Sequence, residues 1–118
     1  AGVNWADHRW NLTLAALWRS GWPTTALSLA ADGTVVAGPR NGARLPSYAT
    51  LDLRASRRFD VARGELTAYL EVTNATSRRN PCCVNWSVAA GADGGPTLVT
   101  DYDHWLPLVP SLGVLWKF

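Results

Sequence analysis

The stretch YATLDLRASRRFDVARGELTAYLEVTNAT, residues 48–76, decides the fold. Apolar and polar side chains alternate through its first half, from Tyr48 to Phe59, and only Arg57 interrupts the apolar positions. A period of two is typical of a strand with one apolar face and one wet face. The apolar positions are Ala49, Leu51, Leu53, Ala55 and Phe59, and the polar ones are Tyr48, Thr50, Asp52, Arg54, Ser56 and Arg58. Arg57 lies near the strand end, where its long side chain can carry the charge to water.

The second half resumes the same alternation after a tight turn at Asp60 to Gly64. One face carries Leu66, Ala68, Leu70 and Val72, and the other carries Thr67, Tyr69, Glu71 and Thr73. Two such segments joined by a short turn predict a β-hairpin. With the turn centred on Ala62 and Arg63, Arg54 falls opposite Glu71, so we expect an ion pair. An acid and base pair made from Asp52 and Glu71 has no accompanying pocket signature, and we favour the structural interpretation.

Two further segments show the strand pattern, which gives expected strands at 9–21, 45–59, 65–77 and 106–118. The apolar faces of the first and last segments carry Trp10, Leu12, Leu14, Ala16 and Trp18, and then Leu108, Leu112, Val114, Trp116 and Phe118. Pro107 and Pro110 are confined to the start of the last segment, where a proline costs few ladder hydrogen bonds. All four segments have the length of a tilted membrane strand.

The connections between these segments alternate in length. Residues 22–44 form a long connection rich in Gly, Pro, Thr and Asn, and residues 78–105 form a second long one, whereas residues 60–64 form a short one. Long loops outside the cell and short periplasmic turns are typical of outer-membrane barrels. We therefore expect 22–44 and 78–105 to be extracellular, and the 60–64 turn and Phe118 to lie on the periplasmic side. Asp32-Gly33, flanked by apolar residues, predicts a short hairpin inside the first loop.

Composition narrows the class of protein further. No apolar run is long enough for a transmembrane helix. The arginines are scattered among carboxylates and the net charge is only +2, which disfavours nucleic-acid binding. Seven Trp lie near the ends of the apolar segments, which suits a membrane interface; a Trp-rich soluble β core is the alternative. With no Met and an opening Ala1-Gly2-Val3 that is unlike a signal peptide, we expect the natural N-terminus to be missing.

The chain resembles the C-terminal end of the barrel of TonB-dependent outer-membrane receptors. The resemblance runs through RWNLTLAALWRSGWPTT (9–25), LPSYATLDLRASRRFDVARGELTAYLEVTNATSRRNPCC (45–83) and LPLVPSLGVLWKF (106–118). It implies an all-β fold in which antiparallel strands form the C-terminal part of a large transmembrane barrel of about 22 strands, not closed on its own. It also implies uptake of a scarce nutrient such as a ferric siderophore or cobalamin.

The resemblance further implies locations, partners and residue roles. The protein would lie in the bacterial outer membrane, contacting lipid, the rest of the barrel and its plug domain. The inner-membrane energy-coupling protein would act through the missing N-terminal part. A terminal pattern of Phe118, Trp116, Val114 and Leu112 resembles the signal that the barrel assembly machinery recognises. The polar side chains expected to face the lumen are Thr50, Asp52, Arg54, Arg58, Glu71 and Lys117.

The 78–105 loop holds the remaining candidates. Cys82 and Cys83 are adjacent, and the sequence allows three interpretations. The first is a strained disulfide between them, the second is a bond to cysteines elsewhere in the protein, and the third is free thiols or a metal site. The residues best placed to touch a ligand are Asp101, Tyr102, Asp103 and Trp105, which would serve equally well as a loop folded onto its neighbours. His8 and His104 are isolated and no catalytic constellation occurs, so we expect no enzyme activity, no cofactor and no metal site.

Two other functions compete with the receptor interpretation. A passive or structural outer-membrane barrel, porin-like or an adhesin, shares the terminal Phe and the loop pattern. A soluble β-sandwich binding module would instead pack its apolar faces on each other. The barrel interpretation predicts two open sheet edges and an exposed face at Leu51, Leu53, Leu70 and Val72 when the chain stands alone.

Overall fold

The computed structural model describes all of residues 1–118 and divides into two compact units. The first, which we call the meander, comprises 1–18, 49–79 and 106–118, and the second, the hairpin unit, comprises 19–48 and 80–105. Both are built from strands and turns. None of the chain forms a helix with the length and apolar character needed to cross a membrane.

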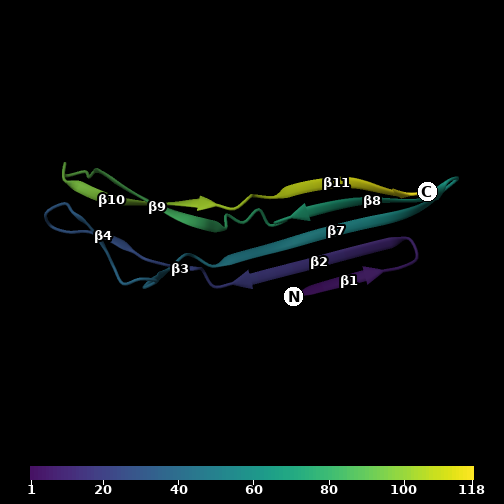
Figure 1. Cartoon of the computed structure of the whole chain (residues 1–118), viewed down its shortest axis with the longest axis horizontal. Coiled ribbons are helices and arrows are strands. Elements are labelled where there is room, and N and C mark those ends of the chain that lie inside the picture. Colours follow the sequence, from purple (N-terminus) through teal and green to yellow (C-terminus); the bar gives the residue numbers. More distant parts are fainter. The chain divides into compact units, whose positions relative to one another are not determined.

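The meander is one five-stranded sheet in the order β1-β2-β7-β8-β11 (Figure 1). Its strands are β1 (Gly2–Ala6), β2 (Trp10–Arg19), β7 (Tyr48–Val61), β8 (Gly64–Thr73) and β11 (Val109–Lys117). β1 pairs antiparallel with β2, and β8 pairs antiparallel with both β7 and β11. β1 and β11 are therefore edge strands, and the sheet does not close on itself. This confirms the predicted all-β, antiparallel, open fold class.

The turn between β7 and β8 is tighter than the sequence indicated. Val61 pairs with Gly64, so only Ala62 and Arg63 lie between the strands. Gly64 has φ +120°, a backbone conformation that side chains other than hydrogen rarely allow. A Cβ on Gly64 would also collide with the carbonyl oxygen of Lys117 on the neighbouring strand β11. Glycine is thus required there both by conformation and by the close approach of β11.

The strand boundaries differ from the expected ones at points with local causes. β8 ends at Thr73 because Asn74 and Ser77, with φ 51° each, turn the chain out of the extended conformation. β11 begins only at Val109, after Pro107. β1 was not predicted at all, since its Gly2–Ala6 stretch is short and has only Val3 and Trp5 as large apolar residues.

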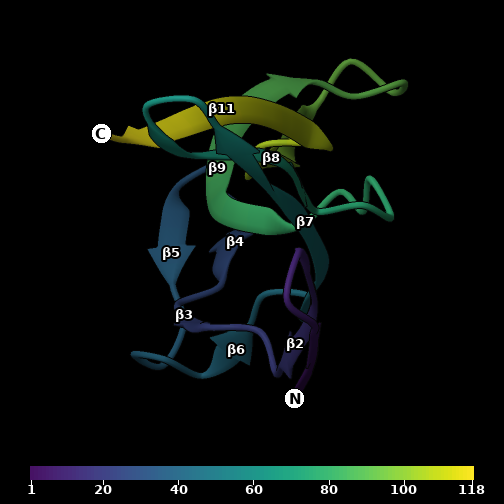
Figure 2. The ribbon, with the colours of Figure 1, turned by 90° about the vertical axis from the view of Figure 1, so that its right-hand side faces the viewer.

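The hairpin unit contains three pairs of strands, two of which lie in the 22–44 connection. β3 (Pro23–Thr24) pairs with β6 (Ala43–Arg44), and β4 (Leu27–Leu29) pairs with β5 (Val35–Ala37) (Figure 2). The β4–β5 pair confirms the hairpin predicted around Asp32-Gly33. Gly33 has φ +82°, and Asp32 accepts hydrogen bonds from the backbone N–H and the hydroxyl of Thr34 at 3.0 and 2.6 Å.

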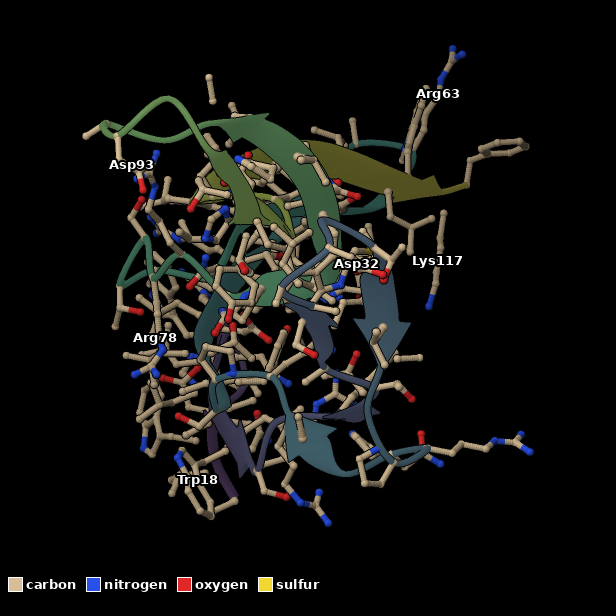
Figure 3. The ribbon with its side chains drawn as sticks, turned by 90° about the vertical axis from the view of Figure 1, so that its left-hand side faces the viewer. Trp18, Asp32, Arg63, Arg78, Asp93 and Lys117 are labelled. Carbon is tan, nitrogen blue, oxygen red and sulfur yellow. The ribbon has the colours of Figure 1, made fainter.

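The 78–105 connection, which the sequence predicts to be a long loop, forms a second hairpin. β9 (Pro81–Ala90) pairs with β10 (Pro96–His104), and the turn between them carries Asp93 (Figure 3). Val84, Trp86 and Val88 alternate with polar residues along β9, which is the signal that could have predicted it. The Pro, Gly and Asp residues around this alternation are depleted in strands and favour loops, which is why the sequence predicts a loop here and not a hairpin.

Neither unit has a buried apolar core, since no hydrophobic side chain of the chain is buried. The only buried polar side chains belong to Asn74 and Asn80. On the face expected to be exposed, Leu53 and Leu70 are exposed and Leu51 and Val72 are half-buried. A soluble domain of this length ordinarily buries several apolar side chains completely. The apolar surface of the sheet is thus left without a partner within the chain.

Candidate functional site

The candidate site is the five-stranded meander itself, which has two chemically different faces. Across β7, β8 and β11 the pairing aligns Leu53 with Val72, and Val72 with Pro110. Two residues further along the same face, Leu70 pairs with Leu112. On the other side, Val3 pairs with Leu14 and Trp5 with Leu12. These two apolar areas join, because Val3, Trp5, Leu12, Leu14 and Leu53 line one shallow hollow of about 420 Å³. We call this continuous surface the apolar face.

Aromatic side chains lie at both ends of the apolar face. The end that carries the Ala62-Arg63 turn, here the turn end, holds Trp10, Phe59, Trp116 and Phe118. Trp18 lies at the opposite, loop end of β2 and is 72% exposed (Figure 3). At about 3.4 Å per residue, Trp10 and Trp18 are about 27 Å apart along the strand. If the strand were tilted by about 40° from the membrane normal, the distance from Trp10 to Trp18 along that normal would be about 20 Å, which is close to the height of the apolar band of an outer-membrane barrel.

The stripe formed by Leu112, Val114, Trp116 and Phe118 belongs to the edge strand β11 and its end. All four side chains are exposed, from 53% for Trp116 to 99% for Phe118. The rings of Trp116 and Phe118 are in edge-to-face contact, with centroids 5.7 Å apart and planes at 67°. The structure therefore places these residues together on the apolar face, as an uncovered stripe along the edge.

The opposite, polar face carries the two ion pairs of the meander. Arg54 lies directly opposite Glu71, and the guanidinium and carboxylate are 3.4 Å apart, which confirms the predicted pair. Arg58 reaches diagonally to Glu65 at 3.3 Å. Lys117 also lies on this face, opposite Glu65 in the pairing of β11 with β8. These charges are partly solvated, so each pair contributes little to stability by itself.

Asp52 is engaged by the backbone at the loop end of β7. Its Oδ1 accepts hydrogen bonds from the hydroxyl of Thr50 and from the backbone N–H of Asn74, both at 2.8 Å. The side chain of buried Asn74 in turn donates to the carbonyl oxygens of Arg78 and Leu106 at 3.0 and 3.3 Å. Asp52 thus fixes the turn that follows β8.

Tyr69 and Gly113 form a contact that the sequence analysis missed. They pair directly across β8 and β11, and the phenol ring of Tyr69 occupies the space that a Cβ on Gly113 would need. The guanidinium carbon of Arg54 lies 4.8 Å from the centroid of the same ring. The sequence alone carries no signal for this contact, because the opposition of Tyr69 and Gly113 depends on the register between β8 and β11.

Arg19 makes a comparable contact in the hairpin unit. Its guanidinium carbon lies 4.6 Å from the ring centroids of both Trp22 and Tyr48. Trp22 is therefore stacked against a cation, and not simply placed at a membrane interface as its position near a segment end suggested.

The predicted ligand-contacting residues lie on and just after β10. Asp103 accepts a hydrogen bond of 2.7 Å from the side-chain amide of Asn85 on β9, and the backbone N–H of Trp105 donates to the carbonyl of Asn80. Asp101 and Tyr102 are neighbours on a strand and point to opposite faces. Asp103 and Trp105 therefore make hydrogen bonds within the hairpin unit, and the four predicted residues do not gather in one pocket.

Cys82 and Cys83 are both free, and they lie at a β-bulge. Pro81 pairs with His104 and Cys83 with Asp103, so Cys82 is the extra residue of β9. Hydrogen bonding to the Cys83 thiol, burial and the negative charges of Cys83 and Asp103 raise the pKa of the Cys82 thiol. The thiol form is favoured at neutral pH, which lowers the nucleophilicity of this cysteine. His, Cys, Asp and Glu side chains nowhere gather in groups of three or more that could hold a metal ion.

Comparisons of the chain with protein-family models, curated proteins and solved structures give no match. The functional interpretation therefore depends on the residues and geometry of the meander.

Proposed function

We propose that this chain forms part of the barrel wall of a TonB-dependent outer-membrane receptor that takes up a scarce nutrient such as a ferric siderophore or cobalamin. The observation that carries the proposal is the meander: five strands with one uncovered apolar face, one polar face with ion pairs, and two open edges. In a barrel wall the apolar face meets lipid, the polar face meets the lumen, and neighbouring strands satisfy both edges.

Solvation energy supports this placement. Apolar surface in water costs roughly 25 cal/mol per Å², and here it extends across five adjacent strands without a covering layer. The aromatic residues at both ends of the apolar face suit the two interfaces of a bilayer, where rings contact lipid and polar groups. In this proposal the Ala62-Arg63 turn is periplasmic and the hairpin unit is extracellular.

The same observation weighs against a soluble β-sandwich, which would bury its apolar faces against each other. A porin-like channel or adhesin shares the amphipathic wall, and the resemblance of the three sequence stretches to the receptor family favours the receptor. The proposed partners are the rest of the barrel, its plug domain, the inner-membrane energy-coupling protein and the barrel assembly machinery.

An uptake assay in cells that express the full-length protein tests the proposal. We expect the protein to fractionate with outer membranes, to change its gel mobility on heating as folded barrels do, and to support growth on a limiting iron chelate or cobalamin. That growth should stop when the energy-coupling protein is deleted. Passive uptake that persists without coupling would point to a porin, and a soluble protein would overturn the barrel proposal.

A further inference from the structure

Arg57 is the only charged side chain on the apolar face of the meander. Its guanidinium carbon lies 5.1 Å from the ring centroid of Trp10 and 4.9 Å from that of Phe59. The ion pairs of the sheet involve Arg54 and Arg58 and leave Arg57 without a carboxylate partner. Aromatic faces attract the cation but accept few of its five N–H groups, so most of its donors stay free for an anion.

A small hollow at the turn end brings further positive charge to Arg57. It measures about 250 Å³ and is lined by Arg9, Arg57, Arg58, Phe59 and Asp60. The backbone N–H of Arg58 donates to the carbonyl of Arg9 at 2.8 Å, which fixes the two arginine-bearing segments side by side. Arg58 is paired with Glu65. The rest of the lining supplies two guanidinium groups, from Arg9 and Arg57, and one carboxylate, from Asp60, so the hollow keeps a positive excess.

We propose that this hollow binds the phosphate of an anionic glycerophospholipid, such as phosphatidylglycerol, in the leaflet at the turn end. The inference rests on the proposed membrane location. Guanidinium groups bind phosphate through paired N–H donors, and the adjoining apolar face offers a surface for the acyl chains. Charge complementarity selects an anionic headgroup, and the turn end faces the periplasmic leaflet in the proposed orientation. A bound lipid would anchor β2 and β7 at that depth of the bilayer.

Native mass spectrometry of the full-length protein released from nanodiscs tests the site. Nanodiscs of phosphatidylcholine with and without phosphatidylglycerol provide the probe, and the retained phosphatidylglycerol is measured. We expect R57Q to lower the retention of phosphatidylglycerol about fivefold, because that is the effect of one arginine near an anionic lipid surface. R57K, which keeps the charge but loses the planar donors, should give an intermediate value. R63Q is the matched control, because Arg63 extends from the turn and does not line the hollow (Figure 3).

The outcomes separate this inference from the proposed function. Failure of the wild-type protein to insert into nanodiscs would overturn both. Normal insertion of R57Q with unchanged phosphatidylglycerol retention would overturn only the lipid site. Displacement of the lipid by excess inorganic phosphate would mark a general phosphate site and would contradict the lipid proposal.

Discussion

The ring of Tyr69 on β8 lies over Gly113 on β11 and fills the position that a side chain there would take. The pair joins the edge strand to its neighbour, and Arg54 stacks on the same ring from β7. Three adjacent strands therefore share one contact on the polar face. The Tyr69 ring fits in this position only because Gly113 has no Cβ, and the ring in turn packs over the backbone that the glycine leaves exposed.

Replacement of Gly113 by Ala should displace the Tyr69 ring and destabilise the folded protein by about 1–3 kcal/mol, as overpacking does. Urea unfolding of the full-length protein in detergent measures the loss. G95A is the control, because a Cβ on Gly95 meets only ordinary contacts, at 3.6 Å or more, with the side chain of Asp93. Equal stability of the two variants would contradict the proposed contact.

The Arg54–Glu71 pair should contribute less than about 1 kcal/mol, since both side chains are substantially exposed, at 54% and 38%. A double-mutant cycle with R54A and E71A measures the coupling energy and separates it from the contact of Arg54 with Tyr69. A coupling well above this value would mean that the surroundings of the pair exclude water far more than the exposure of the two side chains indicates.

Removal of the Asp52 carboxylate should cost more than removal of either charge in the exposed pair. D52A leaves the backbone N–H of Asn74 and the hydroxyl of Thr50 without their acceptor, at a cost of about 1–3 kcal/mol. D52N keeps an acceptor oxygen in place and should recover part of the loss. Hydrogen exchange at the amide of Asn74 gives a local readout, which should rise in D52A; no change there would contradict this function of Asp52.

The turn between β1 and β2 should weaken in acid. The backbone N–H groups of Trp10 and Arg9 donate to Asp7, at 2.7 and 2.6 Å, and lower the pKa of its carboxyl. A lowered folded-state pKa means that the stabilisation is complete above the unfolded pKa and is lost as the pH falls through the folded one. An NMR titration should show a lower pKa for Asp7 in the folded protein than in urea, and identical values would contradict the turn geometry.

The sequence predicted those parts of the structure that depend on alternation and on short-range pairing. The β7–β8 hairpin, the opposition of Arg54 and Glu71, the Asp32-Gly33 turn and the open antiparallel sheet all follow from period-two patterns and turn residues. The patterns could not show which glycine receives a ring, because the Tyr69–Gly113 contact depends on the register between strands far apart in the chain. The bulge at Cys82 is invisible for the same reason: it exists only relative to β10.

The loop regions were harder to predict because their composition and their pattern disagree. Val84, Trp86 and Val88 alternate as a strand does, but Pro, Gly and Asp surround them. The end of β8 is another such case: the left-handed conformation and the side-chain hydrogen bonds of Asn74 end the strand at Thr73, four residues before the predicted end at 77. Local hydrogen bonding of an Asn side chain competes with the strand, and only the folded geometry shows which prevails.

Single-cysteine labelling along β8 tests the membrane-wall proposal most directly. With Cys82 and Cys83 replaced by Ser, the full-length protein in vesicles carries either L70C on the apolar face or T67C on the polar face, and each variant is treated with a small water-soluble maleimide. Outside a membrane the exposed position 70 should react at least as fast as the half-buried position 67. We predict the reverse in the bilayer: T67C labels through the lumen and L70C is protected until detergent is added. Fast labelling of L70C in intact vesicles would contradict the proposal that this face meets lipid.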